Sequence, residues 1–206
     1  GCFSFHETKN IISGEGGALT VNNPELIERS EIIREKGTNR KKFFKGQVDK
    51  YTWVDIGSSY LPGELIAAFL YGQLLEISRL QKDRLEAWST YDIEITRHSN
   101  EYNISTPRIP DGVIHNAHLY YILVEKAEMQ AEIIADMKSQ GITTPFHYIP
   151  LHNSPAGKKY TRTSGDLLVT NKVSKQLIRL PMYPNVKPSQ ARIIDSLLRS
   201  LKKHFH

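Results

Sequence analysis

The sequence predicts an α/β protein, because segments typical of β-strands alternate with segments of helical periodicity. Residues 119–124 (LYYILV) are the most strand-like run, rich in aromatic and aliphatic side chains. A helix is expected over residues 127–139, followed by a short second strand over residues 142–144. Two further helices are expected over residues 166–179 and 188–203, the last with one apolar stripe.

The first part of the chain carries one clear helix start. Asn23 and Pro24 are typical of an N-cap and a first helical position, so a helix is expected to run to about residue 35. Lys36-Gly37 would end it. Its core-facing side chains are expected to be Leu26, Ile27, Ile32 and Ile33.

The remaining segments before residue 119 are a strand, two irregular stretches and a long helix. Residues 18–21 (ALTV) have the composition of a strand, whereas residues 38–57 show no periodicity and are expected to form a long loop. Pro62 would open a helix that continues, with a bend, to about residue 97. Prolines and a glycine break residues 103–116, where no regular element is expected.

The composition is that of an ordinary globular protein, with 39% hydrophobic and 24% charged residues among 206. No apolar run reaches the length of a membrane span and no signal-peptide pattern opens the chain, so a cytoplasmic protein without a membrane partner is expected. The single cysteine, Cys2, excludes an internal disulfide and a cysteine-rich metal site. His147 and His152 have no carboxylate nearby in the sequence, so no metal is expected there either.

The net charge of +5 is uneven, because basic residues crowd the segment 36–50 around Phe43 and Phe44. The segment could bind nucleic acid, contact a nucleotide diphosphate, or form a solvated loop. A solvated loop explains most of these lysines. Nucleic acid is not expected, because the sequence has no basic helix, no zinc-ligand spacing and no RNA-binding aromatic motif.

Lys9 is the candidate catalytic residue. It follows Ser4-Phe5-His6 and precedes the glycine cluster Gly14-Glu15-Gly16-Gly17. A lysine amine is a good nucleophile at neutral pH only where burial or a nearby cation disfavours its ammonium form. Held in a wall between an apolar strand and a glycine turn, Lys9 could form a Schiff base with a carbonyl cofactor. The alternative, a surface lysine in a turn, is the commoner case for a lysine beside such glycines.

This segment resembles the Schiff-base segment of the sugar-nucleotide aminotransferases, pyridoxal-phosphate enzymes with the aspartate-aminotransferase fold. The resemblance runs nearly end to end and includes Arg34-Glu35-Lys36-Gly37, Asp55-Ile56-Gly57-Ser58-Ser59-Tyr60-Leu61, Ala67-Ala68, His147-Tyr148-Ile149-Pro150-Leu151-His152 and Leu180-Pro181-Met182-Tyr183. It implies that residues 1–62 are a remnant of the large domain that binds pyridoxal phosphate. Residues 63–206 would then be a connector helix and the small α/β C-terminal domain.

The resemblance also implies the site residues. Lys9 would form the Schiff base with pyridoxal 5′-phosphate, and Ser4 would bind the phosphate of this cofactor. Ser59 would contact the cofactor phosphate of the neighbouring subunit. Ser59 stands where many relatives carry asparagine, and Leu61 stands where they carry arginine. Tyr148 and His152 are expected to contact the nucleotide-sugar substrate.

The reaction implied by the most similar members moves an amino group from glutamate to the C4 keto group of dTDP-4-dehydro-6-deoxyglucose. The product, dTDP-4-amino-4,6-dideoxygalactose, would serve surface polysaccharides such as lipopolysaccharide or enterobacterial common antigen, and the intact enzyme would be a homodimer. In the family, roughly half of the polypeptide precedes the Schiff-base lysine. The chain therefore resembles a C-terminal portion, expected to have little activity alone. The alternative is a non-catalytic sugar-nucleotide-binding or interaction module with the same fold.

Overall fold

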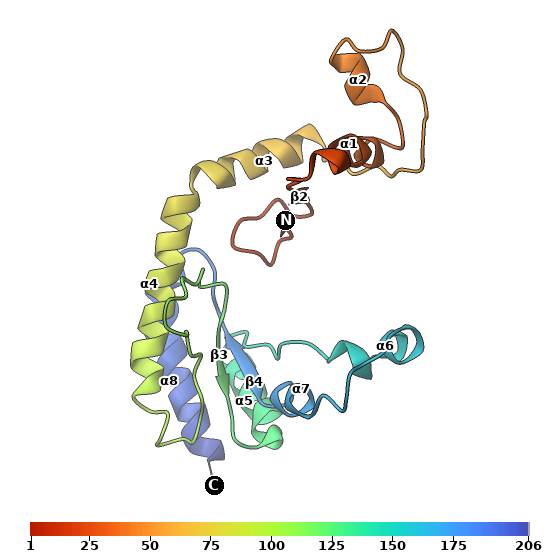
Figure 1. The fold of residues 1–206 in the computed structure, drawn as a ribbon. Helices are drawn as coiled ribbons and strands as arrows, with labels where there is room; N and C mark the ends of the chain where they lie inside the picture. The colour runs from red at the N-terminus through yellow and green to blue at the C-terminus, as the bar shows by residue number, and fades with distance from the viewer. Residues whose placement is uncertain (206) are drawn as a thin grey trace. The chain divides into compact units, whose positions relative to one another are not determined.

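The computed structural model describes residues 1–205, which divide into two units, Gly1–Ser78 and Arg79–His206 (Figure 1). The first unit carries Lys9 and the second carries the hydrophobic core. The resemblance implies a different boundary, between residues 62 and 63, where the large domain of the family would end. That domain boundary stays a prediction.

The first unit begins with a two-stranded antiparallel sheet. Strand β1 (Cys2–Ser4) pairs with β2 (Gly17–Leu19), with Ser4 opposite Gly17. A glycine is required at position 17, because a Cβ atom there would lie 2.7 Å from the carbonyl oxygen of Phe3. The strand predicted over residues 18–21 is thus present, but it is shorter and begins one residue earlier.

The predicted helix after Asn23 forms in two pieces. A 3₁₀ turn, η1 (Pro24–Leu26), leads into α1 (Ile27–Arg34), and the Asn23 side chain accepts a hydrogen bond of 3.0 Å from the backbone N–H of Glu25. The expected burial is wrong, however. Leu26 and Ile27 are exposed and Ile32 and Ile33 are only half-buried, because within Gly1–Ser78 no apolar side chain is buried and there is no core for the helix to cover.

Residues 38–57 are mainly irregular, as predicted, with a short helix α2 (Arg40–Phe44) that the sequence did not indicate. Two glycines close the turn that joins this loop to the end of α1. A Cβ atom on Gly57 would lie 2.0 Å from the backbone nitrogen of Gly37, and one on Gly37 would lie 1.8 Å from the carbonyl oxygen of Asp55. The chain can make this approach only with glycine at both positions.

Helix α3 (Glu64–Leu75) begins two residues after Pro62, with Gly63 in extended backbone at its N-cap. Its apolar side chains point in all directions, and Leu65 is 87% exposed. A helix that is apolar all round is typical of a buried element. After Glu76 the chain continues as α4 (Ile77–Thr96), so the predicted long helix with a bend is confirmed.

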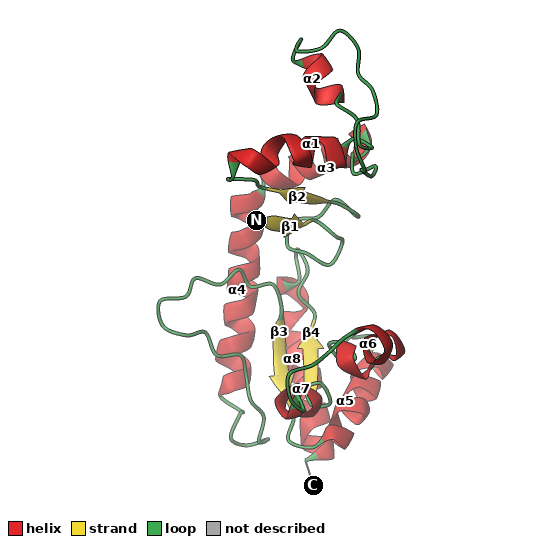
Figure 2. Cartoon of the chain, turned by 45° about the vertical axis from the view of Figure 1, so that its right-hand side comes forward, coloured by secondary structure: helices red, strands yellow, loops and turns green. Residues whose placement is uncertain are grey.

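The second unit is built on a sheet of two antiparallel strands, β3 (Tyr120–Leu123) and β4 (Leu177–Leu180), which Figure 2 shows side by side. Their inner face packs against α4, α5 (Ala127–Ser139) and α8 (Lys187–His204). The fully buried side chains of this core include Tyr91, Ile95, Tyr120, Ile122, Ile133, Met137, Ile178, Leu197 and Leu201. The predicted strand near residues 119–124 and the helices over 127–139 and 188–203 are confirmed.

Two predictions in the second unit are wrong. Residues 142–144 form no strand, and the helix predicted over residues 166–179 is only α7 (Leu168–Val173). The segment after it becomes β4, because Leu177 to Leu180 alternate between half-buried and buried positions and pair with β3. A 3₁₀ turn η2 (Leu151–Asn153) and the short helix α6 (Pro155–Tyr160), capped by the Ser154 side chain, were not predicted.

Buried Arg84 holds the irregular segment that precedes β3. From α4 its guanidinium donates hydrogen bonds to the carbonyl oxygens of Ala117, at 3.2 Å, and His118, at 2.6 Å. Burial lowers the pKa of Arg84. Because two backbone carbonyls satisfy this buried cation, Arg84 has a structural role.

Candidate active site

Lys9 lies in the loop between β1 and β2, where its backbone N–H donates to the carbonyl oxygen of His6 at 2.9 Å. Its side chain is exposed, and the amine has no hydrogen bond or ion pair within residues 1–205. The expectation that a wall shields Lys9 is therefore wrong for this chain. The physical reason is that the first unit buries no apolar side chain and so offers no medium of low dielectric.

His6 and Ser13 organise the Lys9 loop. The His6 ring nitrogen Nδ1 lies 3.0 Å from the Thr8 hydroxyl and accepts from the Thr8 N–H, and Nε2 lies 3.6 Å from Glu15. Ser13 is buried, and its hydroxyl contacts the carbonyl oxygens of Phe5 and Glu15. These contacts fix the loop on both sides of Lys9.

Ser4 Oγ accepts a long hydrogen bond of 3.4 Å from the His6 N–H. The hydroxyl is otherwise open to solvent, since Ser4 is exposed. In this geometry Ser4 shapes the loop, and it keeps a donor hydrogen for a ligand.

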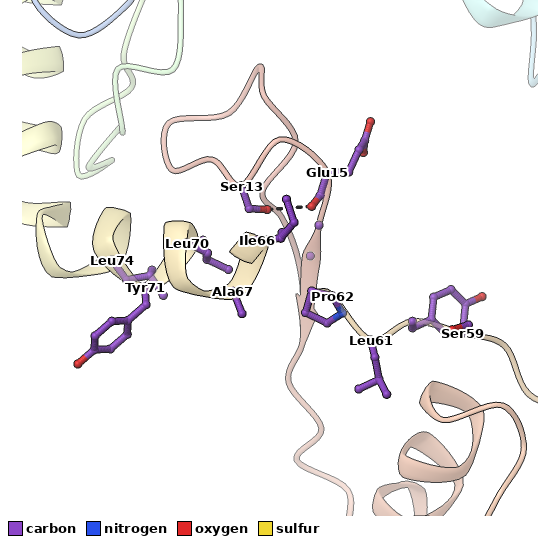
Figure 3. Close-up of a pocket in the computed structure, with 13 residues that line it drawn as sticks. Ser13, Glu15, Ser59, Leu61, Pro62, Ile66, Ala67, Leu70, Tyr71 and Leu74 are labelled. Carbon is purple, nitrogen blue, oxygen red and sulfur yellow. Dashed lines mark hydrogen bonds between the residues drawn. The ribbon is translucent and has the colours of Figure 1, made fainter. Parts of the chain in front are cut away.

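A cavity of about 430 Å³ lies between the glycine turn and α3 (Figure 3). Ser13, Gly16 and Gly17 form one side of it, and Ser59 lies at its margin. The rest of the lining is mainly apolar and consists of Tyr60, Leu61, Pro62, Ile66, Ala67, Leu70, Tyr71 and Leu74, with Glu15 beside the turn. The structure thus brings Ser59 and the glycine turn together, while Lys9 and Ser4 do not line this cavity.

Tyr148 and His152 belong to the second unit. Tyr148 is exposed, and the Arg179 guanidinium lies over its ring at 5.7 Å from the ring centre. His152 takes part in a side-chain hydrogen-bond network. Its Nε2 lies 2.8 Å from Oδ1 of Asn171, and this oxygen also accepts a hydrogen bond of 2.7 Å from the Asn153 side chain. Tyr148 is therefore free to meet a ligand, whereas His152 joins η2 to α7.

The basic segment 36–50 is partly neutralised within the first unit. Lys42 pairs with Glu28 at 2.6 Å, Lys45 pairs with Glu31 at 3.1 Å, and Arg40 lies over the Phe44 ring. These contacts favour the solvated-loop interpretation for the three residues. In the described part of the chain no three acidic, histidine or cysteine side chains gather as a metal site would need, and no helix has the length and apolar character of a membrane span.

Sequence reasoning placed Arg179 in a helix, whereas the structure places it on β4 with its guanidinium over the Tyr148 ring. The alternating pattern of Leu177-Ile178-Arg179-Leu180 was the signal that could have found it, since a period of two assigns Arg179 and Ile178 to opposite faces of a strand.

Comparison with known proteins identifies the chain's class. The fold is that of the pyridoxal-phosphate aminotransferases: the chain matches the solved structure of PseC from Helicobacter pylori, an aminotransferase of pseudoaminic acid biosynthesis, with a TM-score of 0.83 and 28% identity, over 98% of this chain and 53% of that one. Residues 1–198 match the DegT/DnrJ/EryC1/StrS aminotransferase family. The chain belongs to this family.

Two curated proteins are similar to the chain over nearly its whole length. The UDP-4-amino-4,6-dideoxy-N-acetyl-beta-L-altrosamine transaminase of Helicobacter pylori is 32% identical over 203 residues, which cover 97% of this chain and 52% of that protein. The uncharacterized protein MJ1066 of Methanocaldococcus jannaschii is 32% identical over 208 residues, which cover 98% of this chain and 52% of its own. The chain thus spans about half the length of the curated relatives it matches.

The family and its solved structures indicate pyridoxal phosphate as the cofactor, which confirms that prediction. A protein of Streptococcus pneumoniae with the same fold, titled a putative sugar aminotransferase and 22% and 23% identical in two structures, has been solved in PLP and PMP forms. Two side chains present here have chemistry that suits this cofactor, although only Ser59 lines the cavity. The Lys9 amine can attach to the carbonyl group of the cofactor, and the Ser59 hydroxyl can donate to an anionic oxygen.

Proposed function

We propose that this chain supplies the catalytic lysine of a sugar-nucleotide aminotransferase, an enzyme that transfers an amino group from glutamate to C4 of dTDP-4-dehydro-6-deoxyglucose. The product would be dTDP-4-amino-4,6-dideoxygalactose for surface polysaccharide synthesis, and the working enzyme would be a cytoplasmic homodimer. The observation that carries the proposal is Lys9, an amine without an ion pair beside the glycine turn, in a chain that matches the family over residues 1–198.

Each residue has a distinct role in this proposal. Bound pyridoxal phosphate supplies the electron sink for amino-group transfer. Lys9 Nζ holds the cofactor and then moves a proton at the substrate carbon. Ser4, which is exposed, donates a hydrogen bond to the cofactor phosphate. Ser59, which lines the cavity together with Gly16 and Gly17, donates to the cofactor phosphate of the neighbouring subunit. Tyr148 offers an exposed aromatic face to the nucleotide sugar.

The Lys9 amine is more reactive in this role when other residues shield it from water. A neutral amine is the reactive form, and loss of hydration favours it. Since the first unit buries no apolar side chain, the cover would come from residues outside that unit. We therefore expect the chain alone to have little or no turnover.

The exposure of Lys9 favours a second candidate, a non-catalytic module with the same fold that binds sugar nucleotides or a protein partner. The two candidates differ in whether Lys9 reacts with the cofactor in preference to other exposed lysines. The two candidates share the fold and the family, so the reaction of Lys9 Nζ with the cofactor is the observation that distinguishes them.

The test of the proposal is a substrate panel run on this chain supplemented with the part of the family's length that it does not span. The amino sugar formed from dTDP-4-dehydro-6-deoxyglucose and glutamate would be identified by NMR, with the corresponding UDP sugar as the competing substrate. A Lys9→Arg variant is expected to form no product, whereas Lys50→Arg, a change in the basic loop, should behave as the unmodified protein. Turnover by Lys9→Arg would overturn the role of Lys9, and preference for the UDP sugar would overturn the named substrate.

A further inference from the structure

The irregular segment that precedes β3 carries the one Asp-Gly pair of the sequence, Asp111-Gly112, and the sequence has no Asn-Gly pair. An aspartate side chain can close a five-membered imide ring with the backbone nitrogen of the residue that follows it. A side chain on that next residue hinders the ring closure, whereas glycine has none and leaves the backbone free to rotate. The neighbour of Asp111 therefore distinguishes it from the other aspartates of the chain.

The turn that contains this pair is exposed to solvent. A hydrogen bond of 3.2 Å closes it, from the Val113 N–H to the carbonyl oxygen of Pro110. Asp111 and Gly112 are exposed, and Gly112 has a positive φ of 76° with no atom within 4 Å of an added Cβ. Within residues 1–205 the Asp111 carboxylate has no ion pair and the Gly112 N–H has no hydrogen bond. The two reacting groups are therefore adjacent and are not engaged by other groups.

Contacts on both sides of the turn hold the rest of the segment. Before it, Ser105 exchanges backbone hydrogen bonds with Leu123 of β3. After it, the Arg84 guanidinium holds the carbonyl oxygens of Ala117 and His118. A change of linkage inside the turn therefore leaves both ends of the segment in place. The aspartates of α4, α5 and α8 differ, because the backbone N–H that follows each of them belongs to a helix.

We propose that Asp111 is a site of isoaspartate formation, a covalent modification that the folded chain undergoes at its own turn. The Gly112 nitrogen attacks Cγ of Asp111 and an N–Cγ bond forms. One carboxyl oxygen leaves as water, with the amide proton and a proton from solvent. Water then opens the imide at the main-chain carbonyl carbon, which breaks the former peptide bond, frees an α-carboxylate and leads the chain through Cβ and Cγ. The water lost in the first step is regained in the second, so the net change is an isomerisation.

The test is to store the full 206-residue chain at neutral pH and physiological temperature in water enriched in a heavy oxygen isotope. Peptide mapping with electron-transfer fragmentation distinguishes isoaspartate from aspartate, and the isotope marks the opening of an imide. We expect at least roughly tenfold more isoaspartate at Asp111 than at Asp49, which lies in an exposed loop but precedes a lysine. Asp111→Glu is the matched variant, because it keeps the charge but cannot form the five-membered ring. It should lose the modification.

Three results would overturn the proposal: no isoaspartate at Asp111, as much of it at Asp49, or formation only in urea, which would show that the folded chain does not present the turn for reaction. Gly112→Ala should slow the modification by roughly tenfold, and an unchanged rate in this variant would contradict the role of the glycine. Thermal unfolding shows whether each variant is folded, and Asp111→Glu decides if Gly112→Ala is not. The reaction involves neither cofactor nor turnover, so its outcome is independent of the proposed function.

Discussion

Lys9 and Arg179 are basic side chains with no ion-pair partner in residues 1–205, and they differ in what surrounds them. Lys9 is solvated in a hairpin loop whose other polar groups bond to one another. Arg179 is half-buried beside the Tyr148 ring, and its buried Nε atom makes no hydrogen bond. A buried donor without a partner destabilises a protein by about 1–3 kcal/mol.

The pKa of His147 reports directly on Arg179. Since the Arg179 charge is the second cause that lowers this pKa, Arg179→Gln should raise it, while loss of hydration keeps it below its ordinary value of about 6.5. A lowered histidine pKa means that the folded state disfavours the proton. Stability therefore falls as the pH drops below about 6.5, and it falls less in the variant. NMR titration of the His147 ring checks the shift, and an unchanged pKa in a folded variant would show that the two side chains do not interact.

At the scale of elements, the close turn between α1 and the loop before α3 depends on glycine. Gly57→Ala places a methyl group against the backbone of Gly37 and should break the hydrogen bond of 3.0 Å from the Lys36 N–H to the Ser58 carbonyl oxygen. Gly63→Ala is the matched control, because no atom lies within 4 Å of its added Cβ and its backbone is extended. Hydrogen exchange at the Lys36 amide should accelerate only in Gly57→Ala. Equal exchange in the two variants would contradict this account of the turn.

The β3–β4 sheet is the element on which the second unit's core depends. Ile178 is 0% exposed on the inner face, so Ile178→Ala should destabilise the chain by about 2–5 kcal/mol through lost burial and a residual cavity. Leu177→Ala, at the half-buried neighbouring position, should cost clearly less. Urea unfolding followed by Trp88 fluorescence measures both. The assignment of the two faces fails if the two costs are equal.

These elements also show which parts of the fold can be predicted from the sequence. Strand β3 and helices α5 and α8 follow from strong local patterns, because each carries its own periodicity and its own stop signals. Strand β4 does not, since its four residues become a strand only through pairing with β3, which lies more than fifty residues earlier. The error also hid the contact of Arg179 with the Tyr148 ring.

Some features of the candidate site could be predicted from the sequence and others could not. Lys9 and Ser59 could be selected from sequence, through the glycine cluster and the family resemblance, and Ser59 does line a cavity with the glycine turn. The burial of Lys9 could not be predicted, because burial depends on which other residues pack over the loop. The structure adds a contact of His152 with Asn171 that joins η2 to α7, and the predicted contact of His152 with the substrate stays a prediction.

At the scale of the whole molecule, the two units differ in how much apolar surface they bury. The second unit has a continuous core, whereas the first exposes large side chains such as Phe3, Trp53 and Leu65. Exposed apolar patches of this kind are typical of surfaces that another part of a protein covers. The chain spans about half the length of the curated relatives that it matches.

This difference predicts how the chain unfolds. Residues 79–206 contain the core and should keep the cooperative unfolding transition of the full chain, because most buried side chains belong to them. The full chain should bind a hydrophobic dye such as ANS and be cleaved by protease first within residues 1–78. A shortened chain that lost the transition, or that bound as much dye as the full chain, would contradict this division.

The most direct measurement of the central claim is to trap pyridoxal phosphate on the full chain with borohydride at limiting cofactor and map the adduct by peptide mass spectrometry. Lys9 should carry most of the label, ahead of other exposed lysines such as Lys36 and Lys50, and Lys9→Arg should lose that label while remaining folded. A label spread evenly over the exposed lysines, with Lys9 no more reactive than Lys50, would contradict the assignment of Lys9 as the cofactor-binding residue.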